Sequence, residues 1–492
     1  MNHHARNART ALGWNFDNSY ARLPKYFFEQ TNPVPVAAPR MVIFNRSLSD
    51  ALGLDTAALD GPGGAAVFAG NLVPEGALPI AQAYAGHQFG HFTMLGDGRA
   101  ILLGEHVTPG GERFDIQLKG SGRTTFSRRG DGRAALGPML REYIISEAMH
   151  GLGIPTTRSL AVVATGEHVY RETRLPGAIL TRVAASHIRV GTFEYVASQG
   201  NAQDLRSLAM YTIDRHFPEL RGAENPPLAL LAEVLARQAS LVARWLHAGF
   251  IHGVMNTDNM ALSGESIDYG PCAFMDAYDP ATVFSSIDHE GRYAYGNQPS
   301  IAQWNLTRFA ETLLPLLHDS EGTAVEMATA VLDTFPAVFR EFWGSGMRAK
   351  LGLFGEEEGD ADLAQALLRL MRDEGADYTR TLRDLARSPL PDAPFFRGEG
   401  FRRWNERWQA RIARQHQSPE ESRQLMRAHN PAVIPRNHRV EEALAAAAQG
   451  DMDVMKRLLA AMENPFRESP EHADLSLPPA PSAAPYKTFC GT

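Results

Sequence analysis

The sequence predicts a mixed α/β (α+β) protein with a sheet-plus-helix front portion and a mostly helical back portion. Residues 99–119 alternate apolar and polar side chains around a Thr-Pro-Gly-Gly turn, which is typical of a β-hairpin. After Pro226 and Pro227, apolar residues recur at helical spacing up to Gly249. This change of periodicity divides the chain into a first lobe over residues 1–185 and a helical second lobe over residues 186–468.

The remaining elements follow from local patterns. Residues 136–150 carry an apolar helical stripe that stops near Gly151, as helices tend to do. Residues rich in Pro, Ala and Ser after position 469 predict a flexible tail over 469–492. Strands are expected over 159–164 and 178–183, and helices over 303–318, 325–344, 362–373 and 438–461.

Composition excludes several classes of protein. With 44% apolar and 21% charged residues in 492, the chain is globular rather than disordered. The net charge of −8 and the lack of a Lys/Arg block argue against a nucleic-acid partner. No apolar run approaches the roughly 18 residues of a membrane span, and two cysteines cannot form a disulfide scaffold. We expect a monomer in the cytoplasm, or in mitochondria if the source is eukaryotic.

A glycine loop and a lysine mark the first lobe. Gly96 and Gly98 flank Asp97 just before the hairpin, where backbone N–H groups can approach a phosphate, although glycine pairs are often plain turns. Only five of the 48 basic residues are lysines, and one of them, Lys119, ends the second hairpin strand. Glu142 follows 23 residues later on the expected helix, at a spacing that suits an ion pair with Lys119. A surface lysine and a surface glutamate are the alternative interpretation.

The second lobe contains a polar cluster between apolar flanks, at residues 251–260. Asn259 in this cluster and Asp268 nine positions later lie on either side of a turn at 263–265. Their oxygens, completed by phosphate oxygens, would suit Mg²⁺ or Mn²⁺. Alternatively, they only satisfy backbone groups at turns.

Taken in chain order, these parts follow the order of parts in a protein kinase. Counting from His252, the kinase pattern H-R-D-x-x-x-x-N places its asparagine at Asn259 and its catalytic aspartate at position 254, which is a valine. A carboxylate stands instead at Asp258. We therefore predict a two-lobed protein-kinase-like fold whose chemistry differs from ordinary γ-phosphoryl transfer.

At this point the chain resembles the selenoprotein O/YdiU family of kinase-like protein adenylyltransferases. The resemblance covers nearly the whole chain and implies transfer of AMP from ATP to Ser, Thr or Tyr hydroxyls of proteins, with release of pyrophosphate. It also implies a nucleotide flipped relative to active kinases, so that the α-phosphate faces the acceptor. The segments that carry the resemblance are residues 84–90, 95–100, 118–122, 129–133, 153–158, 186–191 and 252–259.

The resemblance also assigns roles to individual residues. Asp258 is implied as the proton acceptor, and Asn259 and Asp268 as ligands of Mg²⁺ or Mn²⁺. Asp268 is also implied as an ATP contact. The other ATP contacts that the resemblance implies are Gly96, Gly98, Arg99, Lys119, Asp131, Gly132, Arg182 and Arg189. Arginines on both sides of a triphosphate would neutralise charge that develops during attack at the α-phosphate.

Three alternative functions stay open. An ordinary protein kinase would transfer the γ-phosphoryl group, and a UMP transferase working with Mn²⁺ would use the same motifs with another base. A catalytically inactive, pseudokinase-like scaffold would bind a nucleotide without transferring any part of it.

Many members of the family carry a selenocysteine near the carboxyl terminus, where this chain has Cys490. The other cysteine, Cys272, follows Asp268 by four residues. We hypothesise that the two form a reversible redox disulfide that gates the cleft, although both could be inert thiols. His87 and His91 have the i, i+4 spacing of zinc ligands but lack the glutamate of H-E-x-x-H, and we interpret them as structural.

Overall fold

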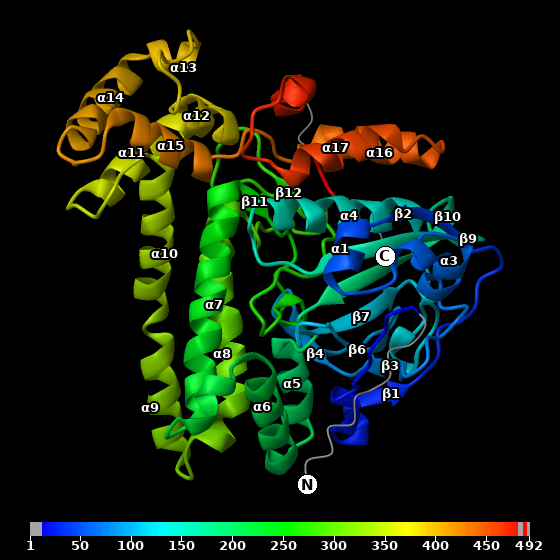
Figure 1. Ribbon diagram of the computed structural model, residues 1–492. Helices are drawn as coiled ribbons and strands as arrows, with labels where there is room; N and C mark the ends of the chain where they lie inside the picture. The colour runs from blue at the N-terminus through cyan, green and yellow to red at the C-terminus, as the bar shows by residue number, and fades with distance from the viewer. Residues whose placement is uncertain (1–11, 481–485, 490–492) are drawn as a thin grey trace.

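The first lobe is a twisted antiparallel sheet in the computed structural model, which describes residues 12–480 and 486–489 (Figure 1). The strand order is β1-β3-β6-β7-β10-β9-β2, and β8 pairs with β10. The expected hairpin is present as β6 and β7, with Ala100 opposite Lys119. The strands are β1 (Phe28–Gln30), β2 (Arg40–Phe44), β3 (Ile80–Gln82), β6 (Ala100–Val107), β7 (Arg113–Lys119), β8 (Ala134–Ala135), β9 (Arg158–Tyr170) and β10 (Arg174–Ala184).

Both faces of this sheet are buried. Leu102 and Leu180 pack on the face covered by α4 (Leu136–Gly151), whereas Leu103 and Ile179 join the core on the other face, beneath α3 (Pro62–Phe68). Because successive strand side chains point to opposite faces, an apolar run serves both cores. Two short helices, α1 (Arg46–Ala51) and α2 (Thr56–Leu59), precede α3.

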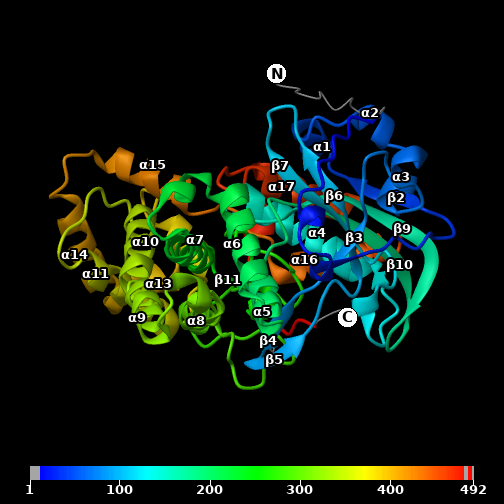
Figure 2. The same cartoon turned by 90° about the horizontal axis from the view of Figure 1, so that it is seen from below.

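The second lobe is organised around α7 (Pro226–Ala248). Asn225 caps its first turn by accepting a hydrogen bond from Leu228 N, and Gly249 ends it with φ +72°. Helices α6, α8, α9 and α10 pack along it (Figures 1 and 2). The further helices are α5 (Val190–Ser198), α6 (Ala202–His216), α8 (Gln298–Leu317), α9 (Glu321–Leu332), α10 (Phe335–Lys350), α11 (Asp360–Asp373), α12 (Tyr378–Asp384), α13 (Pro394–Arg397), α14 (Glu399–Ile412), α15 (Pro419–His429), α16 (Asn437–Ala448) and α17 (Asp453–Glu463).

Two of the segments with a helical pattern are helical, but each contains two helices rather than one. The pattern over 325–344 spans the end of α9 and most of α10, which are separated at Asp333 and Thr334, two residues ahead of Pro336. Proline is tolerated in the first turn of a helix but not in its interior. The pattern over 438–461 is likewise divided between α16 and α17, around Gly450 at φ +89°.

Two small sheets and several 3-10 turns complete the fold. β4 (Ala85–Gln88) and β5 (His91–Met94) form a hairpin, and β11 (Phe250–Ile251) pairs with β12 (Ala273–Phe274). In the described part of the chain, no helix combines the length and the apolar character needed to cross a bilayer. The 3-10 turns are η1 (Tyr20–Arg22), η2 (Lys25–Phe27), η3 (Thr125–Ser127), η4 (Pro218–Gly222), η5 (Thr257–Asn259), η6 (Tyr295–Asn297) and η7 (Pro470–Ser476).

The segment expected to be a flexible tail contains packed residues. Leu475, in η7, is buried, and Thr488 pairs with Ser285 in an isolated bridge. The Thr488 hydroxyl donates to Pro271 O at 2.6 Å. The described end of the chain therefore lies beside the segment that follows Asp268.

Candidate active site

Three cations converge on Asp268. Its Oδ1 lies 3.0 Å from Lys119 Nζ and 2.6 Å from Arg182 Nη2, and its Oδ2 lies 3.1 Å from Arg189 Nη1. Lys119 ends β7, Arg182 stands opposite Gln117 on the adjacent strand β10, and Arg189 directly precedes α5. The sheet and the start of the second lobe thus bring together four residues that the sequence singled out.

Glu142 joins this cluster from α4. Its Oε2 accepts a hydrogen bond from Lys119 Nζ at 2.6 Å, and its Oε1 accepts one from Arg182 Nε at 3.0 Å. The expected lysine–glutamate ion pair is therefore present, and both side chains are buried. Burial alone would raise the carboxyl pKa, but Arg182 and Lys119 outweigh it and hold the pKa of Glu142 below its usual value.

Asp268 is held in an unusual conformation. Its φ is +63°, in the left-handed region that non-glycine residues rarely adopt. Despite burial, Arg182, Lys119 and Arg189 keep its pKa well below the usual aspartate value. The carboxylate is therefore ionised at neutral pH.

Asp258 is different because its carboxylate is buried without an ion pair among the described residues. Only 7% of the residue is exposed, and Oδ1 has no hydrogen-bond partner among the described residues. Burial raises its pKa to about 7, although Arg189 opposes the shift. Arg189 Nη1 donates to Asp258 O at 2.9 Å as well as to Asp268, which places the two aspartates in one site.

Two glycines make room for Asp258. A Cβ at Gly86, in β4, would lie 2.2 Å from Asp258 Oδ1, and one at Gly191 would lie 2.0 Å from the backbone oxygen of Ala85, also in β4, and 3.3 Å from Asp258 Cα. Neither has a positive φ, so close approach is what favours glycine at both positions. Asp258 is therefore clamped between β4 and α5.

Polar contacts fasten β4 to the loop that carries Asp258. His87 N donates to Thr257 Oγ1 at 2.7 Å, and Phe89 N donates to Asn256 Oδ1 at 3.1 Å. Glu194 accepts from Thr257 Oγ1 at 2.6 Å and lies 2.5 Å from His87 Nδ1. His87 thus has a structural partner, and the described residues contain no group of three His, Cys, Asp or Glu side chains arranged to hold a metal.

Asn259 lies in the same turn as Asp258. Its Nδ2 donates to Val254 O at 3.0 Å, which fixes the amide. The valine at the kinase aspartate position thus supports the asparagine through its backbone. Asn259 and Asp268 supply an amide and a carboxylate, the donor types that Mg²⁺ accepts together with substrate phosphates.

The glycine loop is covered rather than open. Any Cβ at Gly96 would lie 2.4 Å from the ring of Phe126, and one at Gly98 would lie 2.8 Å from Phe126 O. Residues around η3 therefore pack directly on this loop. Ser127 Oγ also donates to Gly98 O.

The other implied ATP contacts are less central. Arg99 O accepts a hydrogen bond from Gly120 N at 2.6 Å, so its backbone adjoins Lys119. Asp131 is 45% exposed and pairs with Arg171 at 2.9 Å, while Gly132 packs on Gly122. Among the contacts of the described residues, none joins Asp131 or Gly132 to the cluster around Asp268.

Two site residues received no role from the sequence. Asp97 is buried between Gly96 and Gly98, accepts from Gln82 N at 3.1 Å, and has its pKa raised by burial to about 6. The Tyr84 ring lies under the Arg189 guanidinium, 4.6 Å from its centroid. An acidic residue between two glycines is a signal that could have marked Asp97, whereas the Tyr84 contact has no local signal.

Cys272 is buried and free, and burial raises its thiol pKa to about 12. A thiol in this state is a poor nucleophile, so disulfide formation requires the surrounding chain to open. Cys490 lies outside the described residues. The hypothesis of a Cys272–Cys490 disulfide stays a prediction.

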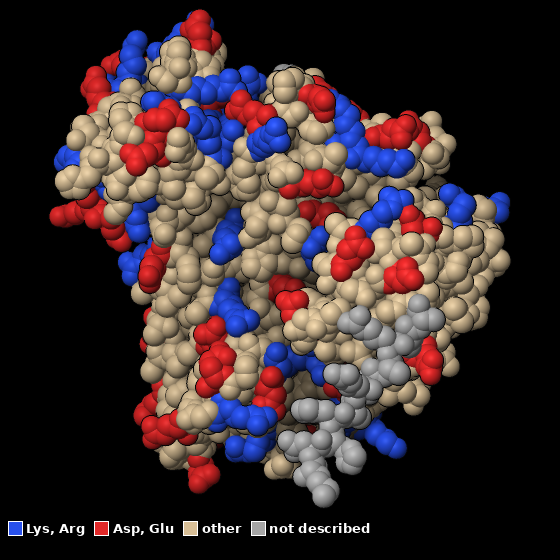
Figure 3. Space-filling view, viewed as in Figure 1, with Lys and Arg blue, Asp and Glu red and all other residues tan. Residues whose placement is uncertain are grey.

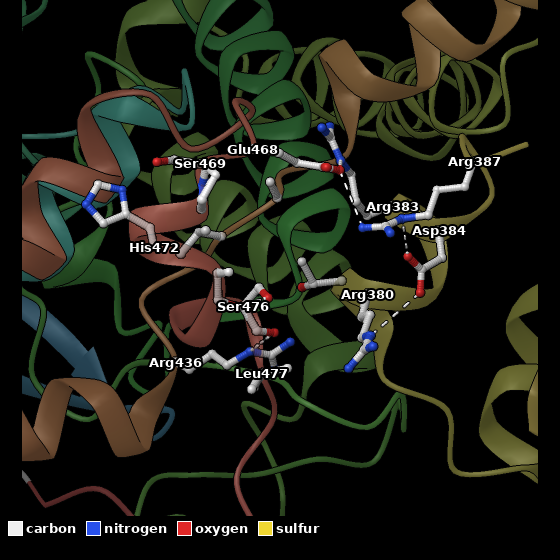
Figure 4. Close-up of a pocket in the computed structure, with 15 residues that line it drawn as sticks. Arg380, Arg383, Asp384, Arg387, Arg436, Glu468, Ser469, His472, Ser476 and Leu477 are labelled. Atoms are coloured by element: carbon white, nitrogen blue, oxygen red, sulfur yellow. Dashed lines mark hydrogen bonds and ion pairs between the residues drawn. The ribbon is translucent and has the colours of Figure 1, made fainter. Parts of the chain in front are cut away.

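A separate cavity of about 350 Å³ lies in the second lobe between α12 and η7 (Figure 4). Its arginines are paired: Arg383 lies 3.1 Å from Glu468, and Arg387 lies 2.9 Å from Asp384. The first ion pair joins α12 to a residue just before η7, and the second joins α12 to the residues that follow it. Acidic and basic side chains are similarly interspersed over the face in Figure 3.

A two-lobed fold with a buried lysine–glutamate pair, an Asp-Asn turn and a following aspartate defines a kinase-like enzyme. A family model described as protein adenylyltransferase SelO matches residues 10–463, so the chain belongs to the SelO family. A protein nucleotidyltransferase YdiU of Syntrophotalea carbinolica is 68% identical over 487 residues, covering 99% of each chain. The proteins of the same name from Brevibacillus brevis and Bacillus cytotoxicus are 63% and 62% identical, and each match covers 98% of this chain and 98% and 99% of the relatives. The expected family and the prediction of an enzyme are confirmed.

Proposed function

We propose that this protein transfers AMP from ATP to hydroxyl side chains of other proteins and releases pyrophosphate. One observation carries the proposal: the buried Asp258 carboxylate has an oxygen with no hydrogen-bond partner among the described residues, and Arg189, which donates to the backbone oxygen of Asp258, links this residue to the cluster around Asp268. Position 254, where a kinase has its catalytic aspartate, is a valine that contributes only its backbone carbonyl to Asn259. The carboxylate available for proton transfer has therefore moved four residues along the loop.

In the proposed reaction, the acceptor hydroxyl oxygen attacks the α-phosphorus while Asp258 takes its proton. The bond between the α-phosphorus and the bridging oxygen breaks, and pyrophosphate leaves with that oxygen. A base with a pKa of about 7 is well matched to this task at neutral pH, because it is partly ionised and still basic enough to accept a proton. Lys119, Arg182 and Arg189 would bind phosphate oxygens and stabilise the charge that develops on them.

A divalent cation fits the same site. Asn259 and Asp268 would hold it, with the remaining ligands coming from phosphates, which explains why the protein need not supply a three-residue cluster. When bound, Mg²⁺ or Mn²⁺ supplies charge neutralisation to the departing pyrophosphate. The carboxylate of Asp268 would then exchange part of its contacts with Lys119, Arg182 and Arg189.

Parallel incubations with α-labelled and γ-labelled ATP test the proposal. AMP transfer leaves only the α label on protein, whereas a protein kinase leaves only the γ label, and an inactive scaffold leaves neither. α-Labelled UTP with Mn²⁺ tests UMP transfer in the same way. Asp258→Asn should reduce transfer by about 10²–10⁴-fold without loss of ATP binding, and Asp373→Asn, at a side chain 60% exposed, is the matched control.

A further inference from the structure

The β4–β5 hairpin carries an open sheet edge directly beside the catalytic loop. Figure 2 shows β4 and β5 at the junction of the two lobes, with β5 outermost. The edge of β4 is already occupied, because His87 N donates to Thr257 and Phe89 N donates to Asn256. β5 has no second strand neighbour within the part of the chain that the structure describes.

The turn and the register fix which backbone groups face outward. Phe89 and Gly90 have φ of +51° and +89°, as in a two-residue type I′ turn. Leu95 N donates to Tyr84 O at 2.9 Å, so alternate pairs, including Gly86 with Thr93, are the hydrogen-bonded ones. Phe92 therefore points its N–H and C=O away from β4. Met94 does the same, and its carbonyl accepts a hydrogen bond from Arg128.

The two faces of the hairpin differ. Gly86 turns the position of its missing Cβ toward Asp258, and its cross-strand partner Thr93 shares that face. The side chains of Phe92 and Met94 lie on the opposite face, and each residue is 46% exposed. Two exposed apolar side chains on a sheet edge that has no strand neighbour among the described residues, one strand away from the catalytic loop, form a surface suited to an extended chain.

We propose that a substrate protein binds by adding an extended, acidic segment as a third strand along β5, with its acceptor residue opposite Thr93. This inference rests on the proposed function and names the form of its substrate. The acceptor would share the face that Gly86 turns toward Asp258, while its two neighbours would pack on Phe92 and Met94. The acceptor is thus flanked on both sides by apolar residues.

The distance from the added strand to Asp258 and the charges around the hairpin restrict which segments can be substrates. An added strand lies two strand spacings, about 10 Å, from β4, so a long acceptor such as tyrosine spans the gap to Asp258 better than serine. Arginines stand at both ends of the hairpin: Arg128 contacts Met94, and Arg292 lies beside Gly90, with its guanidinium 4.8 Å from the Trp304 ring centroid. Acidic residues on either side of the apolar pair complement this charge.

The test uses the full chain, labelled ATP and the synthetic peptide Glu-Glu-Val-Tyr-Val-Glu-Glu. Methylating the backbone nitrogen of either valine removes a hydrogen bond to the β5 edge and should lower kcat/KM by about tenfold. Methylating the tyrosine nitrogen, which points away from β5, should leave kcat/KM nearly unchanged. Replacing the tyrosine by serine should slow transfer.

Matched protein variants test the same edge. Phe92→Pro removes the outward N–H without removing a bond to β4, and it should raise KM for the peptide by about tenfold while AMP release to water stays unchanged. Phe342→Ser, at a phenylalanine 39% exposed on α10, is the control for loss of an exposed aromatic ring.

Several results would overturn the proposal. Equal transfer to all the methylated peptides would do so, and so would an unchanged KM in Phe92→Pro. A dimer in sedimentation that Phe92→Pro dissociates would instead assign the edge to a second copy of the chain. Each peptide is assayed with both α and γ label. Transfer of the γ label alone would refute AMP transfer but still report on the β5 edge, so the two failures are distinguishable.

Discussion

Gly86→Ala should inactivate the enzyme through one added methyl group. The new Cβ would lie 2.2 Å from Asp258 Oδ1 and 2.8 Å from its Cβ and Cγ. Because Gly86 does not have a positive φ, alanine can adopt its backbone conformation without strain. The clash is therefore relieved mainly by movement of Asp258.

The size of that movement follows from the contact. Ordinary van der Waals separation begins at 3.4 Å, so the carboxylate has to retreat by roughly 1 Å. A displacement of this size at a reacting group costs about 10²-fold in rate. The cluster of Lys119, Arg182 and Glu142 is bound to other elements, so ATP affinity should be kept.

Single-turnover transfer of the α label measures the rate, and calorimetric titration with ATP measures binding. Gly137→Ala is the matched control, since nothing lies within 4 Å of the Cβ that it adds. A Gly86→Ala enzyme that transfers AMP at more than half the rate of the Gly137→Ala enzyme would show that the position of Asp258 does not control the reaction.

Burial and charge lead to four further predictions. Since Asp258 acts as a base with a pKa of about 7, kcat/KM should rise with pH up to about 7 and level off above it, and Asp258→Asn should lack this dependence. The unfolded chain loses this proton near pH 4 whereas the fold keeps it up to about pH 7, so the stability of the fold falls between these values. In thermal melts Asp258→Asn should therefore be more stable than the parent at pH 8 and equal to it at pH 4. Arg182→Met removes the buried cation that Glu142 and Asp268 share, so that Lys119 has to serve both carboxylates, and it should cost up to about 3–5 kcal/mol in urea unfolding, whereas a change below 1 kcal/mol would show that the Arg182 ion pairs are dispensable. Mass mapping after mild oxidation should give a Cys272–Cys490 peptide only under conditions that loosen the chain around Cys272, because this thiol is buried, and rapid labelling of native Cys272 would contradict that dependence.

Much of the fold could be predicted from local patterns. The β6–β7 hairpin, α4 and α7 have strong periodicity and clear end signals, and the structure contains all three. The β4–β5 hairpin was missed because four-residue strands around Phe89 and Gly90 give almost no periodic signal. The breaks between α9 and α10 and between α16 and α17 were missed for a different reason. Apolar residues keep a helical spacing on both sides of each break.

The candidate site could likewise be predicted only in part, where a local pattern marked its residues. Lys119, Glu142 and Asp268 were predicted from their order along the chain, and the structure brings them together. Gly86 was missed as a site residue because its role depends on a contact with Asp258, far away in the sequence, whereas Asp97 had a local signal, its two flanking glycines, that was not used. The spacing of residues along one strand does not reveal that β4 lies too close to the catalytic loop for a Cβ at Gly86.

The charges in the cluster give a physical reason for proposing a metal as well as arginines in this site. Three positive charges are carried by Lys119, Arg182 and Arg189. Two of them are neutralised by the ionised carboxylates of Glu142 and Asp268, which leaves a net charge of +1 in the cluster. A triphosphate brings several negative charges into this buried space, where uncompensated charge is costly. The two carboxylates cannot simply be omitted, because without them three buried cations would repel one another. In the proposed reaction, Asp268 would resolve the conflict by acting as a ligand of a divalent cation, which would leave Lys119, Arg182 and Arg189 available for the phosphates.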